Sequence, residues 1–226
     1  YAPGDVGNSI GAALYVAHCI KDQKRDFSFN SSFLGPSFTN IDIQKTLERR
    51  KIQYVELENP CETIAKFICD GKVVAHFNGR MEFGERALGN RSILGDPRNP
   101  KIKDKINSII KYRESYRPFA PAVINEESHK YFEIERNYEC HFMEKVVPVS
   151  LGNRDKLPAI THVDGSGRIQ TVKKEHNERF YNIISEVGKL SGHPLVLNTS
   201  FNIKGEPIVQ SPDDALNTFF NSGLTH

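Results

Sequence analysis

The sequence predicts a mixed α/β domain, in which helices pack against a mixed sheet. Two observations lead to this fold class. Short apolar runs typical of strands alternate with amphipathic patterns typical of helices along most of the chain. Some neighbouring strands are separated by a tight turn and others by a whole helix, and together these two kinds of connection indicate a mixed sheet.

Composition narrows the class of protein further. The chain has 226 residues, of which 38% are hydrophobic and 26% charged, so it can bury a core and is not expected to be disordered. Lys and Arg total 30 against 28 Asp and Glu, and this balance argues against a dedicated nucleic-acid-binding protein. The sequence contains no apolar run of about 18 residues, which a membrane-spanning helix would need.

Cysteine usage and the N-terminal sequence predict a cytoplasmic protein. The first residues do not resemble a signal peptide, and without an initial Met they indicate a piece of a longer chain. The four cysteines form no CxxC pair, so we expect reduced thiols and no structural zinc site.

The N-terminal part differs in composition from the rest. Small residues predict a helix over 5–20, and the polar stretch 21–32 is typical of a linker. We therefore expect 1–32 to be separate from a main domain over 33–226.

Capping signals define the helices of the main domain. Thr39 or Asn40 can begin a helix, and Asn59 and Asn99 each precede a proline, which is favoured at the first helical position. Gly71 is a suitable helix end. The expected helices are 39–51, 60–71, 100–112, 126–132, 177–190 and one that begins at the capping-box-like Ser211-Pro-Asp-Asp214.

Apolar runs bounded by turn residues define the strands. Asp164-Gly-Ser-Gly167 is a hairpin signature and predicts that the runs on either side of it pair. The expected strands are 53–57, 73–77, 119–124, 142–149, 158–162, 168–172 and 195–198.

The segment 79–92 has the highest density of polar residues. Its glycines allow close approach of a ligand, and Arg80, Arg86 and Arg91 carry donors that suit phosphate. It lacks the P-loop pattern. The alternative interpretation is a solvated loop held by Arg–Glu pairs.

Two further segments carry cations. Lys111 lies near the C-terminus of a predicted helix, where the helix dipole alone favours a cation, and Arg117 precedes a predicted strand. Arg168 follows the 164–167 turn, close to His162 and Asp164. Alternatively, His162 is an ordinary histidine of the sheet, and Asp164 only stabilises the turn.

Asn198 and Ser200 stand where a buried strand runs into a polar loop, a frequent place for binding residues. No GxSxG pattern marks Ser200 as a nucleophile, and the alternative is that Asn198 and Ser200 only form a polar turn.

The four segments together offer cations and neutral donors but no acid–base dyad and no HExxH motif. This inventory predicts binding of a phosphorylated small molecule, and phosphoryl or nucleotidyl transfer needs little else.

Three long motifs give a specific resemblance. Residues 79–98 (GRMEFGERALGNRSILGDPR), 161–172 (THVDGSGRIQTV) and 194–209 (PLVLNTSFNIKGEPIV) resemble the carbamoyltransferase family of the NodU type, which includes cephalosporin and tobramycin carbamoyltransferases. The resemblance implies that 33–226 is a YrdC/Sua5-like α/β (α+β) domain with a twisted, mostly antiparallel mixed sheet. It also implies that 1–32 ends a Kae1-like domain.

The resemblance implies a reaction and its residues. The C-terminal domain would form carbamoyladenylate from carbamoyl phosphate and ATP, with Mg²⁺, and the N-terminal domain would transfer the carbamoyl group to a hydroxyl-bearing acceptor. The implied catalytic residues are Arg86, Lys111, Arg117 and Arg168. The implied binding residues are Asn198, Ser200 and, as weaker candidates, His162 and Asp164.

The resemblance also places a metal ligand in the N-terminal segment. Asp5 would be one ligand of Fe²⁺ in the Kae1-like domain, but the HxxxH motif that supplies the others is absent from this chain. We therefore expect that this chain alone cannot carbamoylate an acceptor. Acceptor turnover by the chain alone would contradict this.

Two alternatives remain open. A threonylcarbamoyl-adenylate synthase has similar chemistry and fold, although THVDG and NTSFN favour the carbamoyltransferase family. A YrdC-like domain can also be a non-catalytic nucleotide- or RNA-binding module, against which the small net charge weighs.

Overall fold

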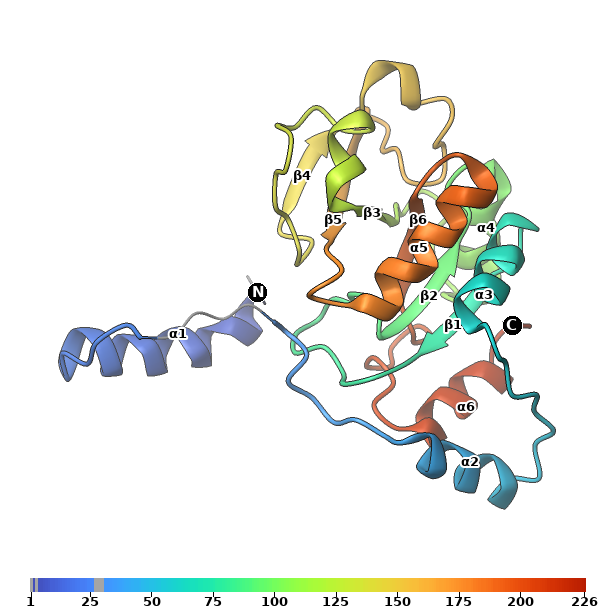
Figure 1. Cartoon of the computed structure of the whole chain (residues 1–226), viewed down its shortest axis with the longest axis horizontal. Helices are drawn as coiled ribbons and strands as arrows, with labels where there is room; N and C mark the ends of the chain where they lie inside the picture. The colour runs from blue at the N-terminus through green and yellow to red at the C-terminus, as the bar shows by residue number, and fades with distance from the viewer. Residues whose placement is uncertain (1, 3, 27–30) are drawn as a thin grey trace.

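The computed structural model describes residues 2, 4–26 and 31–226, and Figure 1 shows their arrangement. Part of the predicted linker, 27–30, lies outside the described residues, as do Tyr1 and Pro3. The N-terminal segment comprises η1 (Asp5–Gly7), α1 (Asn8–Tyr15) and the π-helical η2 (Val16–Ile20). None of the three has a buried residue, and α1 extends away from the body of the molecule (Figure 1).

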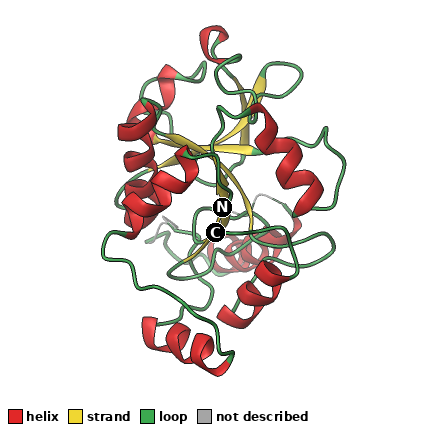
Figure 2. Ribbon diagram, turned by 90° about the vertical axis from the view of Figure 1, so that its right-hand side faces the viewer, coloured by secondary structure: helices red, strands yellow, loops and turns green. Residues whose placement is uncertain are grey.

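The described strands form one six-stranded sheet in the order β1-β2-β6-β3-β5-β4. The strands are β1 (Val74–Phe77), β2 (Arg91–Gly95), β3 (Ala120–Ile124), β4 (Lys145–Pro148), β5 (Ser166–Val172) and β6 (Leu195–Ser200). The pair β3–β5 is parallel and the other pairs are antiparallel. The expected fold class, a mostly antiparallel mixed sheet with packed helices, is confirmed, and Figure 2 shows the helices around the sheet.

Helices begin where the capping residues stand. They are α2 (Asn40–Arg49), α3 (Pro60–Cys69), α4 (Pro100–Ile109), α5 (Glu178–Ser191) and α6 (Pro212–Phe220), with short 3₁₀ turns η3 (Asn125–Lys130) and η4 (Leu151–Asn153). Thr39 and Ser211 each form a full capping box, which pairs otherwise unsatisfied N–H groups at the helix start. Gly192 ends α5 in the left-handed conformation, which glycine adopts without steric cost.

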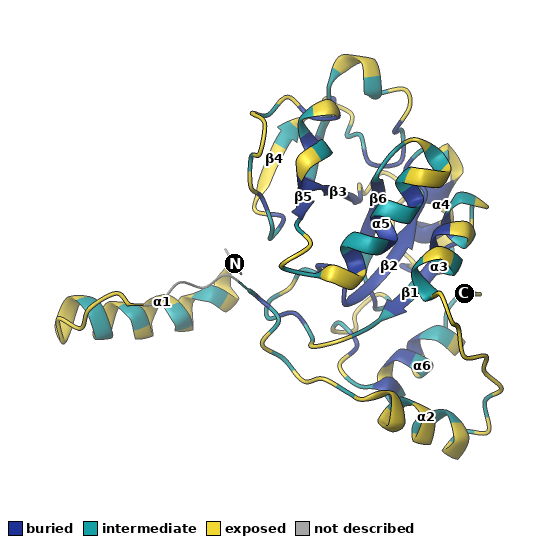
Figure 3. Ribbon diagram, viewed as in Figure 1, coloured by how far each residue is buried: buried dark blue, intermediate teal, exposed yellow. Residues whose placement is uncertain are grey.

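Apolar side chains cover both faces of the sheet. On one face α3 and α5 pack on residues such as Val196 and Val172, and on the other α4 packs on residues such as Leu197 and Ile93. The sheet is buried throughout its centre (Figure 3). Because successive strand residues alternate between faces, Arg168, Gln170, Asn198 and Ser200 belong to the α3–α5 face, beyond the end of its apolar part.

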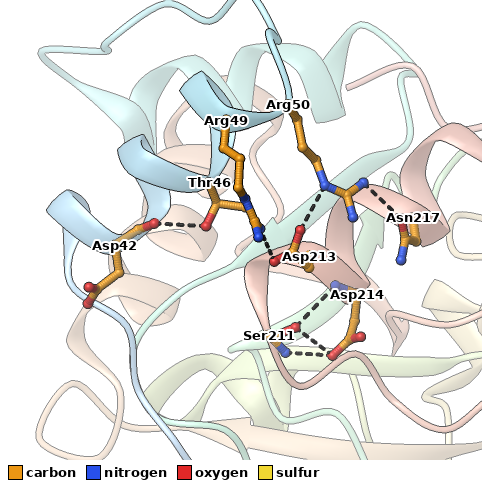
Figure 4. Close-up of polar contacts among 8 residues, drawn as sticks. All are labelled: Asp42, Thr46, Arg49, Arg50, Ser211, Asp213, Asp214 and Asn217. Carbon is orange, nitrogen blue, oxygen red and sulfur yellow. Dashed lines mark hydrogen bonds and ion pairs between the residues drawn. The ribbon is translucent and has the colours of Figure 1, made fainter.

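Helix α2 is attached to the body by charges. It has no buried residue, and Arg49 and Arg50 at its end both donate to Asp213 of α6 (Figure 4). Arg50 Nε lies 2.7 Å from Asp213 Oδ1, and Arg50 Nη1 lies 2.8 Å from Asn217 Oδ1. Figure 3 shows α2 as largely exposed.

Several expected strands are wrong. Residues 53–57 are extended but pair with no described strand, and Val55 is 82% exposed. Residues 158–160 form a turn and 161–162 belong to no strand, so the expected hairpin is absent, and β4 pairs with β5 instead. Strand β2 was not expected, because its first residues, Arg91 and Ser92, are polar although they are buried.

No helix among the described residues is long and apolar enough to span a membrane.

Candidate functional site

The loop between β1 and β2 is folded around one carboxylate. Glu82 Oε1 accepts backbone N–H groups of Leu88 at 2.7 Å, Asn90 at 2.8 Å and Arg91 at 3.2 Å. Gly89 within the loop has a positive φ and its Cα faces Phe180 so closely that a Cβ would lie 2.4 Å from the ring. Glu82 therefore fixes the loop that carries Glu85 and Arg86.

The three arginines of this loop have different surroundings. Arg91 is fully buried, donates to the carbonyls of Asn78 and Gly79, and lies 3.7 Å above the Phe77 ring. Arg80 donates to the carbonyls of Leu34 and Gly35. Arg86, unlike Arg80 and Arg91, is among the described residues that line two neighbouring cavities. Two of the arginines thus stabilise the loop, and the third is available to a ligand.

Two adjoining cavities lie at the polar end of the sheet face. The inner cavity has a volume of about 100 Å³ and the outer cavity about 330 Å³. Arg86, Arg113 and Arg168 line both. Asn198 and Ser200 line the inner cavity, whereas Arg117 and His162 line the outer one. Predicted residues from all four sequence segments are therefore brought together here.

The charge of these cavities is strongly positive. Arg117 pairs with Glu114 at 2.8 Å, and Arg86 lies 3.4 Å from Glu85, which is the only carboxylate among the described residues that line either cavity. Arg168 has no described ion-pair partner, and its Nε is buried without an acceptor. The pKa of Arg168 is lowered mainly by burial and, to a smaller extent, by the nearby charge of Arg86. An anionic ligand would relieve this repulsion.

His162 and Arg113 complete the outer wall. Burial lowers the pKa of His162, which favours the neutral ring. Its Nδ1 lies 3.2 Å from Ser166 Oγ, so Nε2 is the ring nitrogen without a described partner. Arg113 donates to Asn107 Oδ1 at 2.7 Å and stacks on Phe119, which holds its guanidinium at the junction of the cavities. Arg113 lies between Lys111 and Arg117 in the same sequence segment, but it was not among the predicted site residues.

Lys111 lies behind the cavity wall and lines neither cavity. Its Nζ is within 2.5 Å of Ser200 O and of Asn202 Oδ1, and it also donates to Ser200 Oγ and Asn202 O. Burial, and then the charge of Arg113, lower the pKa of Lys111 to about 7. In this structure Lys111 therefore supports the loop that follows β6.

Asp164 and Asp5 also lie outside the two cavities. Asp164 accepts from Ser166 N and Ser166 Oγ, which is ordinary turn chemistry. Asp5 is exposed, and no cluster of three His, Cys, Asp or Glu groups suited to a metal occurs among the described residues. An iron site that includes Asp5 stays a prediction.

A larger cavity of about 690 Å³ lies beside α6. Its described lining includes Met81, Ile208, Asp214 and Asn217 but no arginine or lysine. It therefore lacks the cations that the sequence motifs predict, and the two smaller cavities are the better candidate for an anion site.

The comparisons with known proteins identify the family. Residues 65–226 match the family described as Carbamoyltransferase C-terminus, and the chain belongs to this family. The expected NodU-type resemblance is confirmed, because nodulation proteins are among its relatives. The chain is 41% identical to nodulation protein NolNO of Sinorhizobium fredii and 38% identical to nodulation protein NolO of Bradyrhizobium diazoefficiens, over 99% of its own length in both cases.

The chain is much shorter than these relatives. It covers 33% of NolNO, 41% of NolO and 41% of an uncharacterized Synechocystis protein to which it is 40% identical. Among solved structures, full-length HypF in its phosphate- and nucleotide-bound form resembles 75% of this chain with a TM-score of 0.52. The match covers 21% of HypF at 16% identity, so it supports the fold alone.

Proposed function

We propose that this domain activates carbamoyl phosphate with ATP. Carbamoyl phosphate would be hydrolysed to carbamate and phosphate, and a carbamate oxygen would then attack the α-phosphorus of ATP. The products of the second step are carbamoyladenylate and pyrophosphate. In the complete protein, the carbamoyl group would pass to a hydroxyl-bearing acceptor on another domain. The observation that carries the proposal is the meeting of Arg86, Arg113, Arg117 and Arg168 around two adjoining cavities.

The two cavities suggest a division of binding. The inner cavity has room for about three water molecules, which suits a small anion, and it carries the neutral groups Asn198 and Ser200. The outer cavity is larger and carries Arg117 and His162, which suit the phosphates of a nucleotide. Carbamoyl phosphate would therefore lie in the inner cavity and the ATP phosphates in the outer one.

The shared arginines would act on both ligands. Arg86, Arg113 and Arg168 would neutralise charge where the two anions meet, and they are already placed before the reaction begins. Mg²⁺ would enter with the ATP phosphates, and Glu85 of the adjoining inner cavity is the carboxylate that the described cavity walls offer. Lys111 would act indirectly, by holding the backbone at Ser200.

Pyrophosphate release from ATP, with and without carbamoyl phosphate, tests the proposal. We expect release that requires carbamoyl phosphate and falls about 100-fold or more in Arg168→Ala, because a preplaced charge donor is lost. Arg136→Ala is the matched control, since Arg136 is exposed and lines neither cavity. Circular dichroism checks that both variants are folded.

Calorimetry separates the other outcomes. Nucleotide binding without pyrophosphate release would contradict the adenylating activity and favour a binding module. Release of pyrophosphate that does not depend on carbamoyl phosphate would contradict the assigned substrate. Absence of binding by either ligand would contradict the site itself.

A further inference from the structure

Two buried amide side chains stand in line beneath the β1–β2 loop. Gln170 of β5 is 4% exposed and Asn198 of β6 is 1% exposed. Gln170 Nε2 lies 3.0 Å from the carbonyl oxygen of Leu88. A carbonyl oxygen can only accept, so this contact fixes the nitrogen end of the Gln170 amide and turns Oε1 toward Asn198.

The same reasoning fixes the orientation of Asn198. Its Nδ2 donates to Gln170 Oε1 at 2.9 Å and to the carbonyl oxygen of Ala87 at 3.1 Å. A flipped amide would bring Oδ1 against two other oxygens, which is unfavourable. Both protons of Nδ2 are therefore used, and Oδ1 is turned away from both partners.

Asn198 Oδ1 is consequently an acceptor without a donor. It is buried and has no hydrogen-bond partner among the described residues. Such groups are rare in folded proteins, because leaving a buried acceptor unpaired is costly. Asn198 lines the inner cavity together with Arg168, whose buried Nε has no acceptor. Two residues of the inner cavity therefore each carry one unpaired polar atom, an acceptor on Asn198 and a donor on Arg168.

A carbamoyl phosphate molecule has the complementary groups. Its amide N–H is a donor, and its phosphate and carbonyl oxygens are acceptors. Acetyl phosphate has almost the same shape and charge, but a methyl group replaces the amide nitrogen. A site built to bind an N–H rejects an analogue that lacks it, because its own polar group then stays unpaired.

We propose that Gln170 is a positioning residue that makes the inner cavity selective for carbamoyl phosphate over acetyl phosphate. The inference rests on the proposed function and deepens it. Gln170 does not line the cavity; it holds the Asn198 amide with Oδ1 free to accept the carbamoyl N–H. The Leu88 and Ala87 carbonyls belong to the loop that Glu82 fixes, so the loop and the strands set this orientation together.

Calorimetry of wild type and Gln170→Met with each acyl phosphate tests this proposal without requiring turnover. We expect the wild type to bind carbamoyl phosphate about 10- to 100-fold more tightly than acetyl phosphate. In Gln170→Met the ratio should fall to near one, mainly through weaker binding of carbamoyl phosphate. Gln53→Met is the control, because Gln53 is exposed, and it should keep the wild-type ratio.

The ratio distinguishes positioning from a general structural role. Equal weakening of both acyl phosphates in Gln170→Met would show a structural role and overturn the proposal. Equal binding of the two by the wild type would overturn it as well, even where Gln170→Met does not fold. The proposed function survives that second result, because carbamoyl-phosphate-dependent pyrophosphate release would still be observed.

Discussion

The Nζ of Lys111 lies 2.5 Å from the carbonyl oxygen of Ser200, a residue that lines the inner cavity. The contact joins the chain after α4 to the loop after β6, two segments that are 89 residues apart in sequence. Three further oxygens surround the same nitrogen. The lysine that the motif presents as a ligand contact thus supports the wall of the site from behind.

The buried Lys111 predicts a pH dependence of stability. Its pKa is lowered to about 7 from an ordinary 10.5, so between these values the unfolded chain binds a proton that the folded protein does not. The free energy of unfolding should therefore rise with pH across this window, by at most about 1.4 kcal/mol per pH unit. Urea unfolding at several pH values measures it. Lys111→Met should lose this rise and Lys105→Met, at an exposed position, should keep it. Parallel curves for all three proteins would refute the assignment.

Glu82 predicts a second, larger stability effect. Glu82→Ala leaves three buried N–H groups without their acceptor, and we expect a loss of about 3 kcal/mol in the free energy of unfolding. Glu85→Ala in the same loop should change it by less than about 0.5 kcal/mol, because Glu85 is exposed. Similar losses in the two variants, measured by urea unfolding, would show that Glu82 does not hold the loop.

The attachment of α2 predicts a local effect of Asp213. Hydrogen bonds from Arg49 and then Arg50 lower the pKa of Asp213 below its usual 3.8, so the attachment is fully present above that pH and is lost as pH falls through the lower value. In Asp213→Asn at pH 7, amide hydrogen exchange in 40–49 should become several-fold faster, while exchange in β6 stays unchanged. Asp104→Asn is the exposed control. Unchanged exchange in 40–49 would mean that other contacts hold the helix.

The cysteines predict an order of thiol reactivity. Burial, and then the nearby Glu144, raise the pKa of Cys140 to about 12, and burial also raises the pKa of Cys61 and Cys69. Cys19 is exposed. At pH 8 a thiol reagent should therefore modify Cys19 first and Cys140 only on unfolding, because the thiolate is the reactive form. Peptide mass spectrometry reads the order, and early modification of Cys140 would contradict its burial.

The helices of the main domain were predictable because their signals are local. Thr39 and Ser211 cap helices within one turn of themselves, so neighbouring residues suffice to find them. Strands depend on partners that are distant in sequence. The run 53–57 has a strand-like composition but no described partner, and Arg91 begins a strand because five contacts compensate its burial.

The site was predictable in part for the same reason. The motifs identified Arg86, Arg117, Arg168, Asn198 and Ser200, and the structure places all five at the two cavities. Residue type alone does not separate Arg86 from Arg80 and Arg91, and only the family resemblance selected Arg86. The structure gives the physical difference, because Arg80 and Arg91 donate to backbone carbonyls and Arg91 is fully buried. Gln170 was not selected, although it lies two residues after Arg168 and hence on the same face of β5.

The position of β6 in the sheet has a consequence for the order of folding. This strand lies between β2 and β3, yet it is the last strand of the described chain to leave the ribosome. Without residues 195–200, the remaining strands can form at most two separate sheets, β1–β2 and β3–β5–β4, because β2 and β3 each pair with β6 and not with each other. Asn198 and Ser200 arrive on that same strand. The strand that joins the two halves of the sheet is thus also the strand that completes the wall of the inner cavity.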